Sequence, residues 1–327
     1  MEELDRKLYP LWFIEDKVDM PWGQVSYQIA DLGFVDSMIS EGWFGGNTLS
    51  ELMGTYMERV VGDDAFEYYG LQFPLLVKTI KTTGWQPLQV NVGDEAAEER
   101  YDSFGKKSFW YVLEASDDAS MYLGLKRDVE PADFYNRCQD GTVDKVLHKV
   151  HPKAGDCFII NPGTVFAAGP GLTVLEIGEC SELAFNLETE LEEVFDLIDF
   201  NRYTATSKHV EAKSPLAECD EFKVTRFDLK DPLHIFSEQP GSFAIYYCIS
   251  GEAMVQTPNE SSGFDALDLK AGHSVLVPSE INDYMLFPAR EGTIILEALV
   301  EPRMPRDSYI GDDPGEDTPD PHVRNWN

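Results

Sequence analysis

The segment K-A-G-D-C-F-I-I-N-P, which spans Lys153–Pro162, is echoed in the second half of the chain. Residues Lys270–Pro278 read K-A-G-H-S-V-L-V-P. Each copy has Lys-Ala-Gly, one polar residue, a short apolar run and a proline, which is the pattern of a turn followed by a β-strand. Both copies come late in their half of the chain. The echo therefore indicates two related β-barrels that arose by duplication.

Further apolar runs of strand length surround both copies. Turns that contain glycine and proline separate these runs, an arrangement typical of an antiparallel barrel or jelly roll. In the first half we expect strands at residues 73–80, 88–92, 109–114, 121–125, 146–150, 157–161 and 172–177. In the second half we expect them at 222–229, 243–250, 252–256, 266–269, 274–277, 284–287 and 293–300.

Helical patterns interrupt the strands of the first half. Thr48 and Glu51 have the spacing of a capping box, and apolar residues follow at helical spacing as far as Val60. Shorter helices are expected at residues 94–101 and 130–138. A second capping-box spacing, between Thr189 and Glu192, predicts a helix over residues 189–203 that closes the first unit.

The composition changes twice along the chain. The polar segment 204–218 includes Ser214-Pro215 and is a candidate linker, and the segment from residue 301 onward is rich in Pro and Asp. We therefore expect a pocket-bearing N-terminal domain over residues 1–204, a C-terminal domain over 205–303 and an acidic, proline-rich tail over 304–327.

Acidic residues outnumber basic residues by more than two to one. The 327 residues include 59 Asp and Glu against 26 Lys and Arg, a formal net charge of -33. Such a surface repels phosphate backbones and anionic lipids, so we expect neither a nucleic acid nor a membrane as partner. An anionic ligand would need a local cluster of lysine or arginine side chains to bind.

The cysteine pattern and the N-terminal sequence both indicate the cellular compartment of the protein. The five cysteines form no C-x-x-C pair, which indicates reduced thiols. The N-terminus lacks the basic and apolar regions of a secretion signal. Together these features predict a cytoplasmic protein.

Several stretches, in order along nearly the whole chain, resemble the short bacterial type I mannose-6-phosphate isomerases. They are G-N-T-L-S-E-L at 46–52, F-P-L-L-V-K at 73–78, Q-V-N at 89–91, G-K-K-S-F-W-Y at 105–111 and P-G-T-V-F-A at 162–167. The resemblance implies a mainly β fold of two cupin, or jelly-roll, barrels with helical insertions in the N-terminal half. It also implies an active site in the first barrel, where a bound zinc supports the interconversion of mannose 6-phosphate and fructose 6-phosphate.

Most positions that hold zinc in that family carry residues that bind it poorly. The family ligands are a Gln and a His separated by one residue, a Glu in the pattern G-K-x-E-x-W-Y and a His in the pattern G-T-V-H-A. The matching residues are Gln89, Asn91, Ser108 and Phe166, so one ligand of four is retained. Zinc prefers imidazole, thiolate and carboxylate to amides and hydroxyls, and a phenyl ring offers no donor. No cofactor is therefore expected.

A further loss concerns proton transfer. The family pattern S-D-I-T-Y-R ends in an Arg, whereas the matching segment S-E-L-A-F-N at 181–186 ends in Asn186. Aldose–ketose isomerisation passes through an enediolate whose negative charge needs a Lewis acid or strong hydrogen-bond donors. We therefore expect the family reaction to be absent and assign no residue as catalytic.

Other residues that match the family remain candidates for binding. Lys78 and Lys106 are suited to hold a phosphate or carboxylate, or alternatively to pair with the abundant acids. The expected substrate-binding residues are Lys78, Gln89, Asn91, Lys106 and Ser108. Aromatic side chains that are candidates for stacking on a sugar, or for packing in the core, are Trp85, Trp110 and Tyr111.

Three functions follow from these observations. The first is a mannose-6-phosphate isomerase-like protein that lacks zinc and the family reaction and binds a sugar or sugar phosphate. The alternative is a carbohydrate isomerase or epimerase that uses Glu176, Glu179 or Tyr111 as a base, or recruits a metal through Glu176, Glu179 and Cys180. The third is a protein that acts through an interface, which requires a filled first barrel. Homodimerisation is left open.

Overall fold

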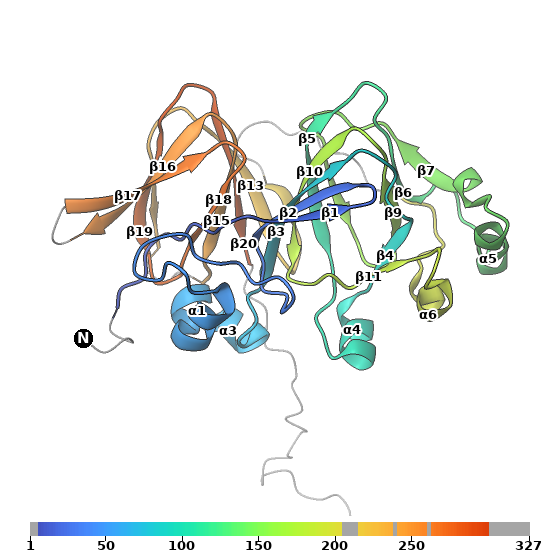
Figure 1. Cartoon of the computed structure of the whole chain (residues 1–327), viewed down its shortest axis with the longest axis horizontal. Helices are drawn as coiled ribbons and strands as arrows, with labels where there is room; N and C mark the ends of the chain where they lie inside the picture. Colours follow the sequence, from blue (N-terminus) through green and yellow to red (C-terminus); the bar gives the residue numbers. More distant parts are fainter. Residues whose placement is uncertain (1–5, 205–214, 238–240, 260–262, 301–327) are drawn as a thin grey trace, which may run out of the picture.

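Two β-sandwiches lie side by side in the computed structural model (Figure 1), which describes residues 6–204, 215–237, 241–259 and 263–300. Each sandwich has two sheets, and the named strands of the described residues pair antiparallel throughout. The predicted mainly β fold of two jelly-roll barrels with helical insertions in the N-terminal half is confirmed.

The N-terminal sandwich carries the first copy of the repeat. Its strands are β1 Asp16–Met20, β2 Gly23–Ile29, β3 Leu75–Thr82, β4 Gln89–Asn91, β5 Ser108–Ala115, β6 Met121–Leu125, β7 Leu147–Val150, β8 Cys157–Ile160, β9 Val165–Ala168, β10 Leu172–Glu179 and β11 Ala184–Asn186. One sheet has the order β1-β2-β3-β10-β5-β8, and the other has the order β11-β4-β9-β6-β7. The apolar side chains between them form the core that surrounds the candidate site.

The C-terminal sandwich carries the second copy. Its strands are β12 Pro215–Glu218, β13 Lys223–Leu229, β14 Leu233–Phe236, β15 Ala244–Ser250, β16 Glu252–Asn259, β17 Gly263–Lys270, β18 Ser274–Val277, β19 Asp283–Pro288 and β20 Thr293–Leu299. The sheets have the orders β12-β13-β20-β15-β18 and β14-β19-β16-β17. In both copies the strand after Lys-Ala-Gly, β8 or β18, forms one edge of its larger sheet.

Helices occur in the N-terminal half and lie at its periphery (Figure 1). They are α1 Leu49–Tyr56, α2 Glu58–Val61, α3 Asp63–Tyr69, α4 Asp94–Tyr101, α5 Pro131–Gln139 and α6 Leu191–Val194. The predicted capping box is confirmed, because the Thr48 hydroxyl accepts from the Glu51 backbone N–H and the Glu51 carboxylate accepts from the Thr48 backbone N–H.

The helix predicted over residues 189–203 is wrong. Only α6 and a single 3-10 turn at Phe195–Leu197 form there, and no side chain caps α6. The chain beyond them pairs with the segment before α5 instead, where Phe200 accepts a hydrogen bond from Val129 and Tyr203 donates one to Leu125. Tertiary pairing has replaced the helix that the capping-box spacing predicted.

Other strands were not expected from the sequence. β12 lies inside the predicted linker, and β1 and β2 lie in a region for which no element was predicted. All five residues of β1 are exposed, so this edge strand lacks the alternation of apolar and polar residues that marks a half-buried strand. Residues 205–214, after the predicted domain limit, and the predicted tail 304–327 lie outside the described residues.

The two sandwiches share one apolar cluster. It includes buried residues of α1–α3 and of β3, β5 and β10 together with residues of β13, β15 and β20. The rings of Phe73 and Phe243 lie 4.7 Å apart between centroids, and Leu11 exchanges backbone hydrogen bonds with Leu276. This cluster covers the outer face of the first sheet, so the inner face of that sheet is left to form the site. Among the helices of the described residues, none is long and apolar enough to span a bilayer.

Candidate functional site

A row of side chains crosses the inner face of the first sheet. Lys78 on β3 is directly opposite Glu176 on β10, and Glu176 is in turn opposite Trp110 on β5. Tyr27 on β2 is opposite Lys78 on its other side. Because side chains directly opposite on neighbouring strands face the same side of a sheet, the four functional groups come together.

Direct contacts link the members of this row. The Lys78 Nζ is 3.4 Å from Glu176 Oε1 and lies 5.5 Å from the centre of the Tyr27 ring. The Trp110 indole N–H donates a hydrogen bond of 2.8 Å to Glu176 Oε2. Glu176 is thus held at both of its oxygens within the sandwich.

Two residues outside the strands complete a cluster of charges. Lys106, just before β5, has its Nζ 3.3 Å from Glu176 Oε1. Glu182, between β10 and β11, receives a hydrogen bond from Lys78 at Oε1 and one from Lys106 at Oε2. We refer to Lys78, Lys106, Glu176 and Glu182 as the charge cluster. Its two ammonium groups and two carboxylates sum to a formal charge of zero.

Mutual attraction favours the charged forms of Lys78, Glu176 and Glu182. Burial alone would raise the pKa of Glu176 and of Glu182, but the ammonium groups of Lys106 and Lys78 outweigh burial and lower both pKa values. Burial would lower the pKa of Lys78, but the carboxylates of Glu176 and Glu182 outweigh it and raise that pKa. A glutamate with a lowered pKa is a weak base at neutral pH.

A partly open cavity of about 180 Å³ lies against the charge cluster. Its wall on the first sheet includes Tyr27, Lys78, Trp110 and Glu176, and its wall on the second sheet includes Gln89, Phe166 and Ala184. The rest of the lining consists of apolar residues of β1 and β2, the amide of Gln86, and Phe34, Ile80, Lys106 and Glu182. Ligand pockets usually measure about 300–1,000 Å³, so this cavity suits only a small ligand.

The four positions that match zinc ligands fit zinc poorly. Phe166, which is opposite Gln89 in the register of β4 and β9, packs edge-on against Trp110 with 5.6 Å between ring centres. Ser108 donates a hydrogen bond of 3.5 Å to Glu176. Asn91 is fully buried, and neither atom of its side-chain amide has a hydrogen-bond partner among the described residues. An amide, a hydroxyl and a phenyl ring do not make a zinc site.

The residues considered for a recruited metal site do not converge. Glu179 is an odd number of residues from Glu176 on β10, and its Oε2 accepts from the Lys107 backbone N–H rather than facing the cavity. The Cys180 thiol contacts the backbone of Asp31, and burial raises its pKa to about 12. Among the described residues, no three His, Cys, Asp or Glu side chains are grouped to hold a metal ion.

The three aromatic candidates lie in different environments. Trp110 lines the cavity, but Tyr111 on the next position of β5 points to the opposite face and packs in the cluster between the sandwiches. The suggestion that Tyr111 serves as a base in the pocket is therefore wrong. Trp85 stacks on Tyr122 with ring centres 4.9 Å apart and does not line the cavity.

The expected binding residues divide into two groups. Lys78, Gln89 and Lys106 line the cavity, whereas Asn91 and Ser108 are buried behind its wall. Asn186, at the family Arg position, is opposite Gln89 in the register of β11 and β4, and its side-chain oxygen accepts from the Glu188 backbone N–H. It does not line the cavity.

Sequence reasoning did not single out Glu182 or Tyr27. Glu182 lies in the quoted S-E-L-A-F-N segment, where the family pattern has Asp, so an acid at that place was a signal that could have been used. The position of Tyr27 depends on the pairing of β2 with β3, and neither the strand nor its register was evident from the sequence.

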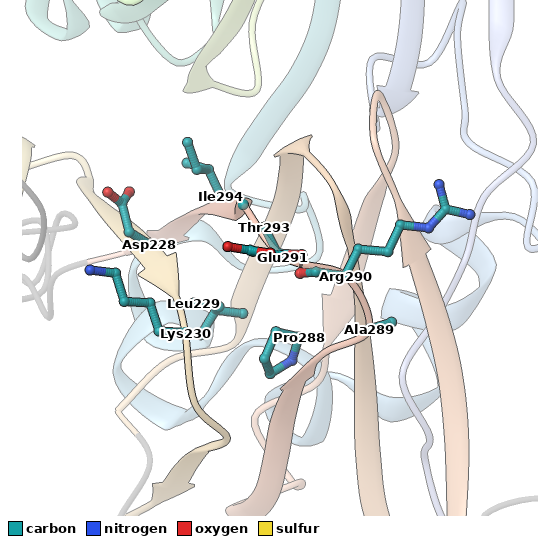
Figure 2. Close-up of a pocket in the computed structure, with 10 residues that line it drawn as sticks. Asp228, Leu229, Lys230, Pro288, Ala289, Arg290, Glu291, Thr293 and Ile294 are labelled. Carbon is teal, nitrogen blue, oxygen red and sulfur yellow. Dashed lines mark hydrogen bonds between the residues drawn. The ribbon is translucent and has the colours of Figure 1, made fainter.

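A groove in the C-terminal sandwich has no comparable group of converging side chains among the residues that line it (Figure 2). The end of β13 and the turn between β19 and β20 form it. Figure 2 shows Lys230 and Arg290 extending in opposite directions. Arg290 is 70% exposed and pairs with Glu252, while Asp228 pairs with Arg226. These side chains form separate pairs and do not meet in one cluster, so the N-terminal cavity remains the candidate site.

Comparisons with known proteins agree with this architecture. Residues 213–295 match a family model described as "Mannose-6-phosphate isomerase, cupin domain". Mannose-6-phosphate isomerase ManA of Bacillus subtilis is 26% identical over 270 residues, which cover 76% of this chain and 82% of that protein. Mannose-6-phosphate isomerase of Streptococcus mutans is 28% identical over 151 residues, or 46% of each chain.

Solved structures show the same fold. The crystal structure of the Bacillus subtilis mannose 6-phosphate isomerase superposes with a TM-score of 0.74 at 16% identity, covering 89% of this chain and 99% of that one. A putative mannosephosphate isomerase from Archaeoglobus fulgidus superposes with a TM-score of 0.75 at 22% identity, covering 90% and 99%.

Proposed function

We propose that this chain, which belongs to the mannose-6-phosphate isomerase family of cupin proteins, binds a small carbohydrate without zinc and without the family's isomerisation. The observation that carries the proposal is the pairing of a polar cavity with a lost metal site. Lys78, Gln89 and Lys106 line the cavity, while Phe166 stands at a family ligand position. The cavity thus keeps polar side chains that can bind a sugar, but it lacks the residues that would hold a Lewis acid.

The chemistry of the cavity favours a polyhydroxylated ligand. Amides, ammonium groups and carboxylates provide both donors and acceptors, and Trp110 provides an aromatic surface. A volume of about 180 Å³ limits the ligand to about the size of one sugar unit. We further propose a cytoplasmic location, which the five free cysteines favour, and a small molecule as the partner.

Direct titration tests this proposal. Calorimetry on the full chain, stripped with a chelator, should detect binding of mannose or fructose, and Gln89→Ala should weaken it because Gln89 lines the cavity. Gln256→Ala makes the same change on β16 of the other sandwich and should leave the affinity unchanged. Absence of any sugar binding, or equal weakening by both variants, would contradict the proposal.

A second candidate function is a carbohydrate isomerase or epimerase with a protein base. The observation that favours it is Glu176, a buried carboxylate that lines the cavity next to two ammonium groups. The lowered pKa of Glu176 argues for the binding function instead. Sugars incubated with the protein in D₂O would distinguish the two, because a base that removes a carbon-bound proton introduces deuterium. We expect no incorporation.

A further inference from the structure

Glu182 occupies the space between two lysine ammonium groups. One of its oxygens receives a hydrogen bond from Lys78 and the other from Lys106. The Tyr27 hydroxyl adds a third hydrogen bond of 3.0 Å to Oε1. Two cations, one at each oxygen, are the environment that a phosphate or carboxylate group of a ligand would receive from the same lysines.

The charge balance leaves no attraction for an added anion. Lys78 and Lys106 are the basic side chains that line the cavity within the part of the chain that the structure describes. Glu176 and Glu182 neutralise both of them. A ligand phosphate would therefore enter a formally neutral site in a protein of formal charge -33, unless one carboxylate leaves.

Glu182 is the most exposed member of the charge cluster. Its side chain is 20% exposed, against 7% for Lys78 and 4% for both Lys106 and Glu176. It lines both the cavity and a neighbouring, more open groove of about 680 Å³, and Phe34 also lines both. The groove gives the Glu182 side chain an open space beside the two buried lysines.

We infer that Glu182 is a specificity-determining residue that occupies the anion position of the cavity, so that the cavity selects uncharged carbohydrates over phosphorylated ones. The inference rests on the proposed function, since it narrows the ligand class of that same cavity. An anionic ligand must displace a carboxylate that is attached to the protein and therefore present at a high effective concentration. The family pattern has the shorter Asp at this position, where the extra methylene of Glu182 extends the reach of the carboxylate.

Substitution of Glu182 tests the inference with inorganic phosphate as the probe. Glu182→Gln removes the internal anion and leaves two ammonium groups against one carboxylate. Phosphate should then raise the melting temperature of the variant but not of the wild type. Affinity for mannose 6-phosphate should rise by about tenfold or more. The ligand phosphate then no longer competes with the Glu182 carboxylate, and a gain of about 1.4 kcal/mol in binding free energy is enough for a tenfold change in affinity. Affinity for mannose, which carries no anionic group, should change far less than affinity for mannose 6-phosphate.

Two further variants serve as controls for charge and for folding. Glu188→Gln removes the same charge from an exposed side chain nearby and should respond to phosphate as the wild type does. Glu182→Asp keeps the charge, and should therefore fold if Glu182→Gln does not, but its shorter side chain should bridge the lysines less well. We expect its response to phosphate to lie between those of the wild type and Glu182→Gln.

The outcomes separate this inference from the proposed function. Equal stabilisation of the wild type and both Glu182 variants by phosphate, or stabilisation of none of them, would overturn the role of Glu182. Phosphate binding gained by a Glu182 variant while the wild type binds no sugar would support the anion position and contradict the proposed function. If the wild type binds sugar but no Glu182 variant gains phosphate binding, the role of Glu182 is contradicted and the proposed function is not.

Discussion

Lys78 and Glu176 are directly opposite each other on β3 and β10, with 3.4 Å between Nζ and Oε1. Both side chains are almost fully buried, at 7% and 4% exposure. Two ions withdrawn from water in this way add little net stability, because the loss of hydration offsets most of their attraction. A well-packed apolar pair would stabilise the sheet at least as well, so the pair is better explained by what it does in the cavity.

Removing the charge of Glu176 should destabilise the fold. Glu176→Gln leaves the ammonium groups of Lys78 and Lys106 with one carboxylate, and breaking a buried ion pair costs about 3–5 kcal/mol. Urea unfolding measures this change in the free energy of unfolding. The exposed control Glu188→Gln should change it by less than about 0.5 kcal/mol. Similar values for the two variants would show that the charge cluster is not coupled as described.

The buried side-chain amide of Asn91 should lower the free energy of unfolding. Its amide is fully buried without a partner among the described residues, and an unsatisfied buried polar group costs about 1–3 kcal/mol. Asn91→Leu, which is similar in size and apolar, is therefore expected to raise the free energy of unfolding by up to that amount. A loss of stability in the same urea experiment would mean that the amide has a partner in solution.

Phe166 should support the wall of the cavity. It is 5% exposed and packs against Trp110, so Phe166→Ala should cost about 3–5 kcal/mol of stability. Phe236→Ala removes a ring that is 59% exposed on β14 and should have a small effect. If Phe166→Ala were as mild as that control, the ring would not be supporting the wall of the cavity.

Because of the charge cluster, the free energy of unfolding should depend on pH mainly at acidic pH. The pKa values of Glu176 and Glu182 are lowered by folding, so their contribution is present above pH 4.5, the ordinary pKa of a glutamate, and is lost as the pH falls further. The pKa of Lys78 is raised, so its contribution is present below pH 10.5 and is lost as the pH rises through the higher folded value.

Unfolding at a series of pH values checks this dependence. The difference in free energy of unfolding between the wild type and Glu182→Gln should be constant between about pH 5 and 9 and should shrink below pH 4.5. A difference that stays constant down to about pH 2.5 would show that Glu182 does not owe its charge to the lysines.

The sequence allowed much of the strand framework to be predicted, because apolar runs between glycine and proline turns are local signals. The same reasoning predicted a helix at residues 189–203, where pairing of Tyr203 with Leu125 prevails over a local capping pattern. The resemblance singled out Lys78, Gln89 and Lys106, which line the cavity, and their role in binding stays a prediction. The role of Glu182 depends on two lysines, one of them 104 residues away, so no local pattern reveals it.

Metal content, measured together with turnover, tests most directly the proposal that this protein works without zinc. Protein purified without chelator should be analysed for zinc and assayed for mannose 6-phosphate isomerisation with and without added zinc. We predict far less than one zinc per chain and no isomerisation under either condition. One zinc per chain, with isomerisation that a chelator abolishes and added zinc restores, would contradict that proposal.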